Sequence, residues 1–338
     1  MNNVLLVQVD GNLPNLALMK LSAWHKGVGD NVYLDECPTI PDIVYVSAIF
    51  SESKEEALLQ RVKYPHSKVI IGGSAVDKKL KLPNYIEHLM PDYSLYDGKI
   101  CTNCNHLITR CACRREPQPG NIDFSMGFSS RGCFRNCDFC IVREKEGFIH
   151  DNAPISEFHH PDHDKLVLYD NNFLASPKWR ENLQFLIDRK IKTSFNQGND
   201  IRLINKENAE LLSQVKYYDY KFKNRRLYFA FDDVSMKKEV INGIELLMDS
   251  GIKPNRLMFY MLMDFNSTFD EDYERFNILS SFGIKPYVMI YNKNSRNPTP
   301  IVRHFARWVN GRFYNIFPFE VYDSGTSQIH IQQWLSEK

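Results

Sequence analysis

Short runs of apolar residues recur along the chain and alternate with segments of helical spacing. The first run, residues 3–9, is almost continuously apolar, which is typical of a strand covered on both faces of a parallel sheet. Similar runs follow at residues 43–50 and 69–73, and residues 16–24 have apolar positions at helical spacing. Strands that alternate with helices predict a doubly wound α/β unit over residues 1–95, with loops at the carboxyl ends of the strands available for a ligand.

The same alternation returns between residues 121 and 322. Runs that predict strands cover residues 165–169, 192–196, 227–231, 256–263 and 286–290. A helix is expected from Trp179 to Lys190. Repeated units of this kind build a parallel sheet that curls toward a barrel, with its chemistry on the loops at the carboxyl ends of the strands. The tail, residues 323–338, predicts a loop and a short helix that either caps the barrel or packs on a partner.

The composition is that of an ordinary globular protein long enough for two domains. The chain has 338 residues, of which 43% are hydrophobic and 25% charged. Its formal net charge of +1 argues against a globally basic nucleic-acid binder, although a local basic patch stays compatible with it. No run approaches the ~18 apolar residues of a membrane helix, and Met1 is followed by no basic signal region. We therefore expect a cytoplasmic protein without a membrane partner.

Cysteines are concentrated in one part of the chain. Seven of the eight lie between Cys101 and Cys140, and in a cytoplasmic protein this clustering favours metal binding over disulfides. The first set, in a cysteine-rich insert and linker at residues 96–120, has the spacing C-x2-C-x6-C-x-C and comprises Cys101, Cys104, Cys111 and Cys113. Two such pairs predict a structural zinc knuckle. A second iron–sulfur cluster, or free thiols on a surface hairpin, are the alternatives.

Other side chains of this insert bear on the same question. His106 is a candidate to replace one thiolate. Arg110, Arg114 and Arg115 crowd the loop, either to contact a phosphate-bearing partner or simply as a solvated charged loop.

The second set of cysteines has a different spacing. Cys133, Cys137 and Cys140 form C-x3-C-x2-C on one short loop. Three thiolates hold three irons of a 4Fe–4S cluster and leave the fourth iron without a protein ligand. The alternative is a zinc loop, but a closed zinc site needs a fourth nearby ligand, and the next candidate, His150, lies ten residues beyond Cys140. The spacing therefore favours the cluster.

Residues 133–140 resemble the cluster-binding loop of the radical S-adenosylmethionine (SAM) superfamily, C-x3-C-x-aromatic-C, with Phe139 as the aromatic residue that packs beside SAM. The resemblance extends over residues 121–322 and implies a partial (β/α)6 barrel of the TIM type. In that family the free iron binds the amino and carboxylate groups of SAM. An electron from an external flavodoxin- or ferredoxin-type donor then cleaves SAM to a 5′-deoxyadenosyl radical, or SAM is used as a group donor.

The resemblance also implies SAM contacts at the ends of four strands, and the first two are as follows. Asp170-Asn171-Asn172 stands where the family has its Gly-Gly-Glu motif for the SAM amino group, and is similar to the D-D-N variant of relatives with a cobalamin domain. Gln197, Asp200 and Arg202 follow the next strand, where family members contact the SAM ribose and carboxylate. An arginine is suited to a carboxylate because it donates two parallel hydrogen bonds.

Two further strand ends complete the implied SAM site. Asp232 ends the strand at residues 227–231, while Tyr260 and Asp264 lie on and after the next strand, near the usual place of adenine. Each polar residue at these strand ends could instead cap the following helix.

Residues 1–95 resemble the cobalamin-binding-type domain that precedes many radical SAM barrels, including a Gly72-Gly73 turn after a strand. The D-x-H-x-x-G motif of that domain is absent, and His25 lies inside a predicted helix. A Gly-Gly pair also serves any tight turn. We favour a degenerate, cofactor-free domain over a cobalamin site.

The resulting hypothesis is a radical SAM enzyme that acts on a nucleotide, a nucleic-acid base, a peptide or a small molecule. The alternatives are a cobalamin-dependent radical SAM methyltransferase and a non-catalytic, metal-organised binding module. Residues 216–226 interleave basic and aromatic side chains, which suits either a stacking surface for nucleic acid or a helix end with an edge strand. The near-zero net charge favours the second interpretation.

Overall fold

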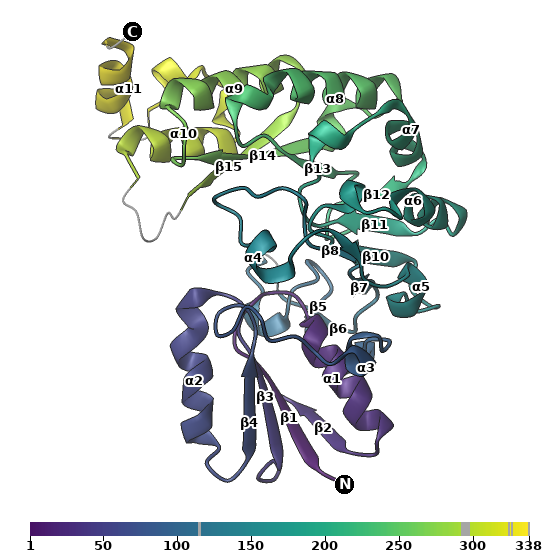
Figure 1. The fold of residues 1–338 in the computed structure, drawn as a ribbon. Coiled ribbons are helices and arrows are strands. Elements are labelled where there is room, and N and C mark those ends of the chain that lie inside the picture. The colour runs from purple at the N-terminus through teal and green to yellow at the C-terminus, as the bar shows by residue number, and fades with distance from the viewer. Residues whose placement is uncertain (114–115, 292–297, 324, 326, 337–338) are drawn as a thin grey trace.

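The computed structural model describes residues 1–338 except 114–115, 292–297, 324, 326 and 337–338. Figure 1 shows two halves stacked on each other, the purple N-terminal half below the teal, green and yellow C-terminal half. Within the described ranges, no helix combines the length and the apolar character needed to cross a bilayer. The cytoplasmic location stays a prediction.

The N-terminal half is built on a four-stranded parallel sheet with the order β2-β1-β3-β4. Its elements are β1 (Asn3–Gln8), α1 (Leu16–Gly27), β2 (Asn31–Leu34), β3 (Ile43–Ser47), α2 (Lys54–Lys63) and β4 (Lys68–Gly72). The strands expected at residues 3–9, 43–50 and 69–73 are confirmed, whereas the short strand β2 was not predicted. Alternate residues of β1 lie in different cores: Val4 and Leu6 pack with α1, and Leu5 packs with Ala57 of α2. This is why the run is apolar throughout.

A connecting segment joins the two halves through buried tyrosines. It contains α3 (Asn84–Glu87), the short turn η2 (Tyr93–Tyr96), β5 (Ile100–Cys101), η3 (Ile108–Arg110) and β6 (Pro119–Gly120). The Tyr93 hydroxyl donates to the Phe158 carbonyl at 2.6 Å and accepts from the Met126 amide at 3.0 Å. The apolar core of α1 continues through this segment to Phe124 and Val167. The domain limits expected at residues 95 and 120 stay predictions.

The C-terminal half contains two parallel sheets, with the orders β12-β11-β10-β7 and β13-β14-β15. Their strands are β7 (Ser125–Gly127), β10 (Lys165–Leu168), β11 (Lys192–Phe195), β12 (Lys216–Tyr217), β13 (Leu227–Ala230), β14 (Leu257–Met263) and β15 (Lys285–Ile290). An isolated parallel bridge between Asn199 and Phe229 links the two sheets. The α/β class with parallel sheets is confirmed, and the described strands form no closed barrel.

Helices cover the outer face of these sheets, and shorter elements flank the strand ends. The helices are α6 (Trp179–Asp188), α7 (Lys206–Gln214), α8 (Lys237–Asp249), α9 (Phe269–Ser281) and α10 (Pro300–Asn310). The flanking elements are β8 (Ser130–Arg131), α4 (Val142–Glu146), β9 (His150–Asp151) and α5 (Ile155–Phe158). The helix expected from Trp179 to Lys190 is therefore confirmed, two residues shorter at its end.

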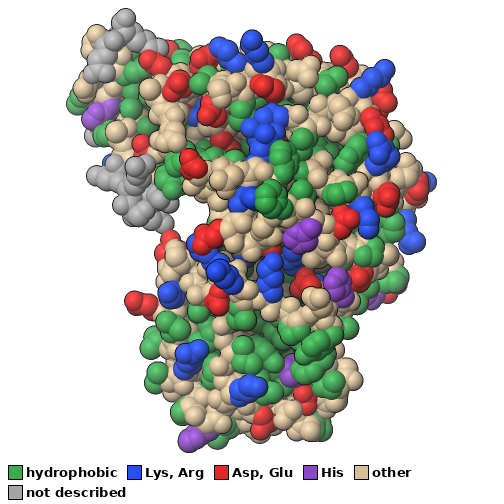
Figure 2. Space-filling model, in the orientation of Figure 1, with side chains coloured by type: hydrophobic (Ala, Val, Ile, Leu, Met, Phe, Trp, Pro, Cys, Tyr) green, Lys and Arg blue, Asp and Glu red, His purple; other side chains and the backbone are tan. Residues whose placement is uncertain are grey.

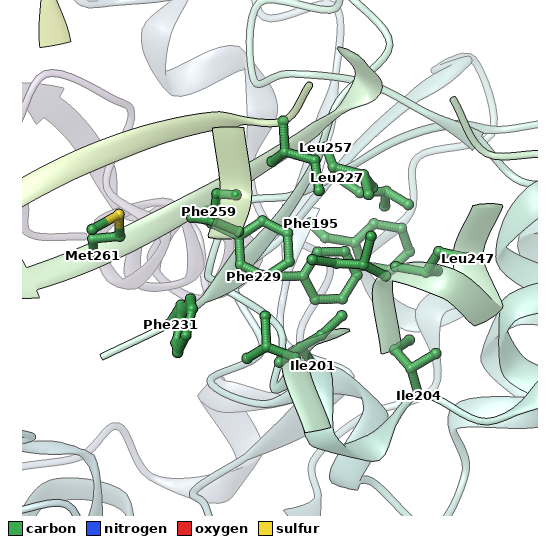
Figure 3. Packing of buried hydrophobic residues seen from close by; sticks show 14 of the residues in the cluster. Phe195, Ile201, Ile204, Leu227, Phe229, Phe231, Leu247, Leu257, Phe259 and Met261 are labelled. Atoms are coloured by element: carbon green, nitrogen blue, oxygen red, sulfur yellow. The ribbon is translucent and has the colours of Figure 1, made fainter. Parts of the chain in front are cut away.

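The main core lies between the strands and this outer layer. Figure 3 shows Phe195, Phe229, Phe231 and Phe259 packed with Leu247 of α8. Phe229 and Phe259 are fully buried and their rings stack at 5.5 Å. The residues between them along β13 and β14 point to the opposite, inner face, because side chains alternate along a strand.

The tail folds back on the barrel helices. Its helix α11 (Ser327–Ser336) buries Ile331, and the Trp334 indole donates to the Asp270 carboxylate at 3.0 Å. The helix predicted within residues 323–338 therefore packs on the C-terminal half, while capping of a barrel and packing on a partner both stay predictions. Residues 324, 326, 337 and 338 lie outside the described ranges.

Replacing Phe229 by Ala should lower the free energy of unfolding by about 3–5 kcal/mol, because it empties a large site in a tightly packed core. Met289→Ala on the inner face of the same sheet is the control, since Met289 is 40% exposed and should cost far less. Chemical denaturation of both variants measures the difference. Equal losses would contradict the assignment of the core to the outer face.

Candidate metal centres and cofactor site

The buried carboxylate of Asp170 organises the loop that carries the second cysteine set. Asp170 follows β10, and it accepts hydrogen bonds from the Ser129 amide at 2.8 Å and hydroxyl at 2.5 Å. It also accepts from the Ser130 amide at 2.8 Å and hydroxyl at 2.7 Å. Burial raises the pKa of Asp170, although these four hydrogen bonds favour the carboxylate form. The end of β10 therefore determines where the chain enters the loop.

The two asparagines that follow Asp170 reach the loop itself. The Asn171 side-chain oxygen accepts from the Gly132 amide at 3.0 Å, and the Asn172 amide donates to the Cys133 sulfur at 3.5 Å. Gly132 has a φ of +80°, and a Cβ there would meet the Phe148 carbonyl, so the backbone needs glycine. The Asn172 side-chain oxygen is buried and has no hydrogen-bond partner among the described residues. It is thus an acceptor available to a bound ligand.

Asp200 joins the loop to the strand end after β11. Its carboxylate accepts from Arg135 of the loop at 2.7 Å and from Arg202 at 2.6 and 3.1 Å. Arg202 is near enough to Cys137 to favour its thiolate, but burial dominates and raises the pKa of the Cys137 thiol. The predicted residues Asp200 and Arg202 therefore lie together at the cysteine loop, paired with each other.

The loop also contacts the third and fourth strand ends. Asp232 follows β13, and its carboxylate accepts from the Leu262 amide at 3.1 Å; its negative charge disfavours the Cys137 thiolate. Burial raises the pKa of Asp232. The ring of Phe139 packs edge-on against Phe265, 5.5 Å away.

The remaining predicted residues are less closely tied to the loop. Gln197 is exposed. Tyr260 lies on the inner face of β14, stacked on Tyr228 at 5.6 Å, and burial raises its pKa to about 12. Asp264 follows β14 with a left-handed φ of 61°. The polar ends of β10, β11, β13 and β14 are thus gathered at one edge of the sheets, as expected for parallel strands.

Sequence reasoning missed the side chains that support the loop. Ser129 and Ser130 have no distinctive spacing, and Arg135 stands within the cysteine motif without belonging to it. Arg143 of α4 packs on the ring of Phe148 at 3.4 Å and donates to the Cys133 carbonyl at 3.3 Å. A period-two pattern was the available signal for Tyr228, which stands next to the buried Phe229.

The first cysteine set forms a compact group that can hold a metal ion. The sulfurs of Cys101, Cys104, Cys111 and Cys113 all lie within 4.8 Å of one another. Thiolates in tetrahedral positions about 2.3 Å from one zinc ion are about 3.8 Å apart, close to this arrangement. Hydrogen bonds from neighbouring thiols and backbone outweigh burial and lower the pKa of Cys101 to about 7, whereas burial raises the pKa of Cys104 to about 12.

This four-cysteine knuckle lies between the two halves of the protein. On one side the Arg110 guanidinium donates to the carbonyls of Gln8 and Val9, at 2.7 and 2.8 Å. On the other side Asn105 donates to the Tyr220 carbonyl at 3.1 Å, and His106 stacks on the Tyr220 ring. His106 is therefore not a member of the thiol group. Arg114 and Arg115 lie outside the described residues.

Neither a scan against models of known protein families nor a search of curated proteins finds a match to this chain. The assignment of a function therefore depends on the residues themselves.

Replacing Cys104 by Ser should remove about one metal ion per chain and lower the unfolding temperature, because the knuckle joins the two halves and its metal contributes folding energy. Metal analysis and thermal unfolding measure the two effects. Cys37→Ser, outside both sets, is the matched control and should change neither. A Cys104→Ser protein with unchanged metal content and stability would exclude a metal at this site.

Replacing Asp170 by Asn should lower the free energy of unfolding by about 1–3 kcal/mol and reduce the iron bound after anaerobic reconstitution, because an amide nitrogen then faces serine donors. Asp138→Asn, on an exposed position of the same loop, is the control. Chemical denaturation and iron analysis measure both variants. If the two behave alike, the buried carboxylate does not organise the loop.

Proposed function

We propose that this protein is a radical SAM enzyme, in which Cys133, Cys137 and Cys140 hold a 4Fe–4S cluster and SAM is cleaved reductively to modify a second substrate. The single observation that carries the proposal is the gathering of a three-thiol loop with the polar ends of β10, β11 and β13. Such an edge is where parallel α/β proteins bind ligands. When bound, the cluster and SAM supply the one-electron chemistry; the protein supplies position and exclusion of water.

The residues around the loop suit the charged end of SAM. The Asn172 amide nitrogen donates to the Cys133 sulfur, and the buried side-chain oxygen of the same residue has no partner among the described residues and can accept from an ammonium group. Arg202 donates to Asp200 through Nε and one terminal nitrogen, which leaves the other terminal nitrogen for a carboxylate. Asp170 and Asn171 already accept from the loop backbone, so we assign them to positioning the loop, and Asn172 to SAM.

Phe139 and Asp232 define the side of the loop that faces the barrel interior. The Phe139 ring packs edge-on against Phe265, which follows β14. Asp232 follows β13, and its charge acts on the Cys137 thiol. We propose that the second substrate binds on this side of the loop, where it would be shielded from bulk water.

The N-terminal half supports the cofactor-free version of the proposal. In a sheet of order β2-β1-β3-β4 a ligand binds at the carboxyl ends of β1 and β3. Here Asp10 bridges these ends by accepting from the Ile49 and Phe50 amides at 2.9 and 2.8 Å, and Arg110 of the knuckle covers the β1 carbonyls. A Cβ at Gly73 would lie 2.1 Å from the Ala48 carbonyl oxygen, so packing alone accounts for the Gly72-Gly73 turn.

For the knuckle we propose zinc. The four sulfurs are close enough to surround a single ion, whereas the thiolates of a 4Fe–4S cluster bind four different irons and lie farther apart. The metal then has a structural role at the boundary between the halves, separate from the cluster loop.

Cys137→Ala should abolish formation of 5′-deoxyadenosine when reconstituted protein is incubated anaerobically with SAM and dithionite. The variant loses one of three cluster ligands, while Cys37→Ala should retain full activity. Chromatography of 5′-deoxyadenosine and S-adenosylhomocysteine provides the measurement. S-adenosylhomocysteine as the main product, with bound cobalamin, would favour the methyltransferase. If the wild-type protein binds no iron and stays colourless, both radical SAM hypotheses are excluded and the non-catalytic binding module remains.

A further inference from the structure

Along the inner face of the β13-β14-β15 sheet, the side chains change in character from one end of the strands to the other. The register pairs Tyr228 with Met258 and Lys285, and the next inner layer pairs Ala230 with Tyr260 and Tyr287. The layer beyond that, toward the cysteine loop, contains Leu262 and Met289. The layers from Lys285 to Met289 span about 13 Å at the usual rise of a strand. The face is thus basic at one end and aromatic in the middle.

The aromatic layer is open to solvent and held rigidly. Tyr287 is 44% exposed, although it lies on the face that a closed barrel would bury. Its ring meets Tyr260 edge-on at 6.1 Å, and Tyr260 stacks on Tyr228 with an angle of 7° between the rings. Two partly buried tyrosines therefore fix the ring of the exposed one.

The basic end consists of cations without carboxylate partners. Burial lowers the pKa of Lys285, and like-charge repulsion from Arg226 and Arg312 adds to this effect. None of these three forms an ion pair among the described residues. One terminal nitrogen of Arg226 is buried without a hydrogen-bond partner there. Clustered, unpaired cations favour a bound anion.

This arrangement differs from the outer surface. Figure 2 shows basic and acidic side chains interspersed over the visible face, in agreement with the net charge of +1. In residues 216–226, which interleave basic and aromatic side chains, Arg225 has structural partners. It packs on Tyr217 at 4.0 Å and donates to the Val215 carbonyl at 2.9 Å. Arg226, at the end of that segment, directly precedes β13 and lies near enough to Lys285 for the two charges to repel.

We propose that this inner face binds a nucleotide unit, with a phosphate on Arg226, Lys285 and Arg312 and the base stacked on Tyr287. The unit is either a free nucleotide or part of a single strand. The proposal rests on the proposed function and names its substrate class. The far end of the bound unit then points along Met289 toward Leu262 and Asp232, at the strand ends that face the proposed cluster loop.

The observations favour a nucleotide over an acidic peptide. A carboxylate-rich peptide would pair with the cations, but its carboxylates would make no stacking contact with the exposed ring of Tyr287. A base stacks on such a ring in any sequence, and stacking contributes about 1–3 kcal/mol per base.

Binding of fluorescein-labelled single-stranded RNA and DNA hexamers to the full chain, followed by fluorescence anisotropy, tests the proposal. Tyr287→Leu should raise Kd about fivefold or more, whereas Tyr287→Phe, which keeps the stacking surface, should bind like the wild type. The double variant Arg226→Gln/Lys285→Gln should reduce the slope of log K against log salt by about 1.4 for a single strand. Lys238→Gln, exposed on the outer helix α8, is the matched charge control.

Competition by unlabelled adenosine monophosphate separates the two sources of the ligand. Displacement at similar affinity indicates a free nucleotide, and its failure with intact hexamer binding indicates a strand; either outcome supports the nucleotide unit. Absence of binding by both probes overturns the proposal. The proposal is also overturned if Lys238→Gln weakens hexamer binding as much as the inner-face variants do. It is likewise overturned if polyglutamate displaces the hexamers equally well from the wild type and from Tyr287→Leu.

This test is independent of SAM cleavage. Hexamer binding is measured without SAM or dithionite, so it does not depend on SAM cleavage. Nucleotide binding without 5′-deoxyadenosine formation would defeat the proposed function alone. SAM cleavage with hexamer affinity unchanged by Tyr287→Leu would defeat the nucleotide assignment alone.

Discussion

One buried carboxylate determines the geometry of the candidate centre. Asp170 accepts four hydrogen bonds from Ser129 and Ser130, and so joins the end of β10 to the beginning of the cysteine loop. A charge at this depth is stable only with its acceptor sites occupied, so the two strand ends have one favourable arrangement. Two further side chains fix the loop in the same way: Asn171 accepts from the Gly132 amide, and Asp200 accepts from the Arg135 side chain. Three thiols on irregular backbone are thereby tied to regular strands, which a site of defined geometry requires.

The four-cysteine knuckle applies a comparable constraint between the halves. Its backbone and side chains contact the ends of β1 through Arg110 and the loop after β12 through Asn105. Such a small segment buries few apolar side chains of its own, and a bound metal would supply the folding free energy that this small core lacks. The same contacts lie at the sheet edge where doubly wound folds bind ligands. In the cofactor-free version of the proposed function, the N-terminal half serves as a support for the C-terminal one.

Much of the fold follows from local patterns. The apolar runs of β1, β3, β10, β13 and β14 predicted parallel strands, because strands covered by helices are mostly apolar. The pattern failed for β2, whose Val32 and Leu34 are separated by Tyr33 and preceded by Asn31, and for β7, whose serine and glycine carry no apolar signal. For the site, the spacing of Cys133, Cys137 and Cys140 indicated a metal loop, since thiolate number and spacing are chemical properties of the sequence.

The sequence by itself determined the elements, their parallel arrangement and the two cysteine sets. Only the tertiary structure decided how the polar strand ends are used. Asp170, Asn171 and Asn172 follow one another at the end of β10, and the sequence does not distinguish their roles. In the structure the first two accept hydrogen bonds from the cysteine loop, whereas the side-chain oxygen of Asn172 has no partner among the described residues. Likewise, whether Tyr287 is buried or exposed depends on the open sheet, not on its strand. The physical reason is that hydrogen-bond partners and exposure are set by residues distant in the chain, and no local period reports them.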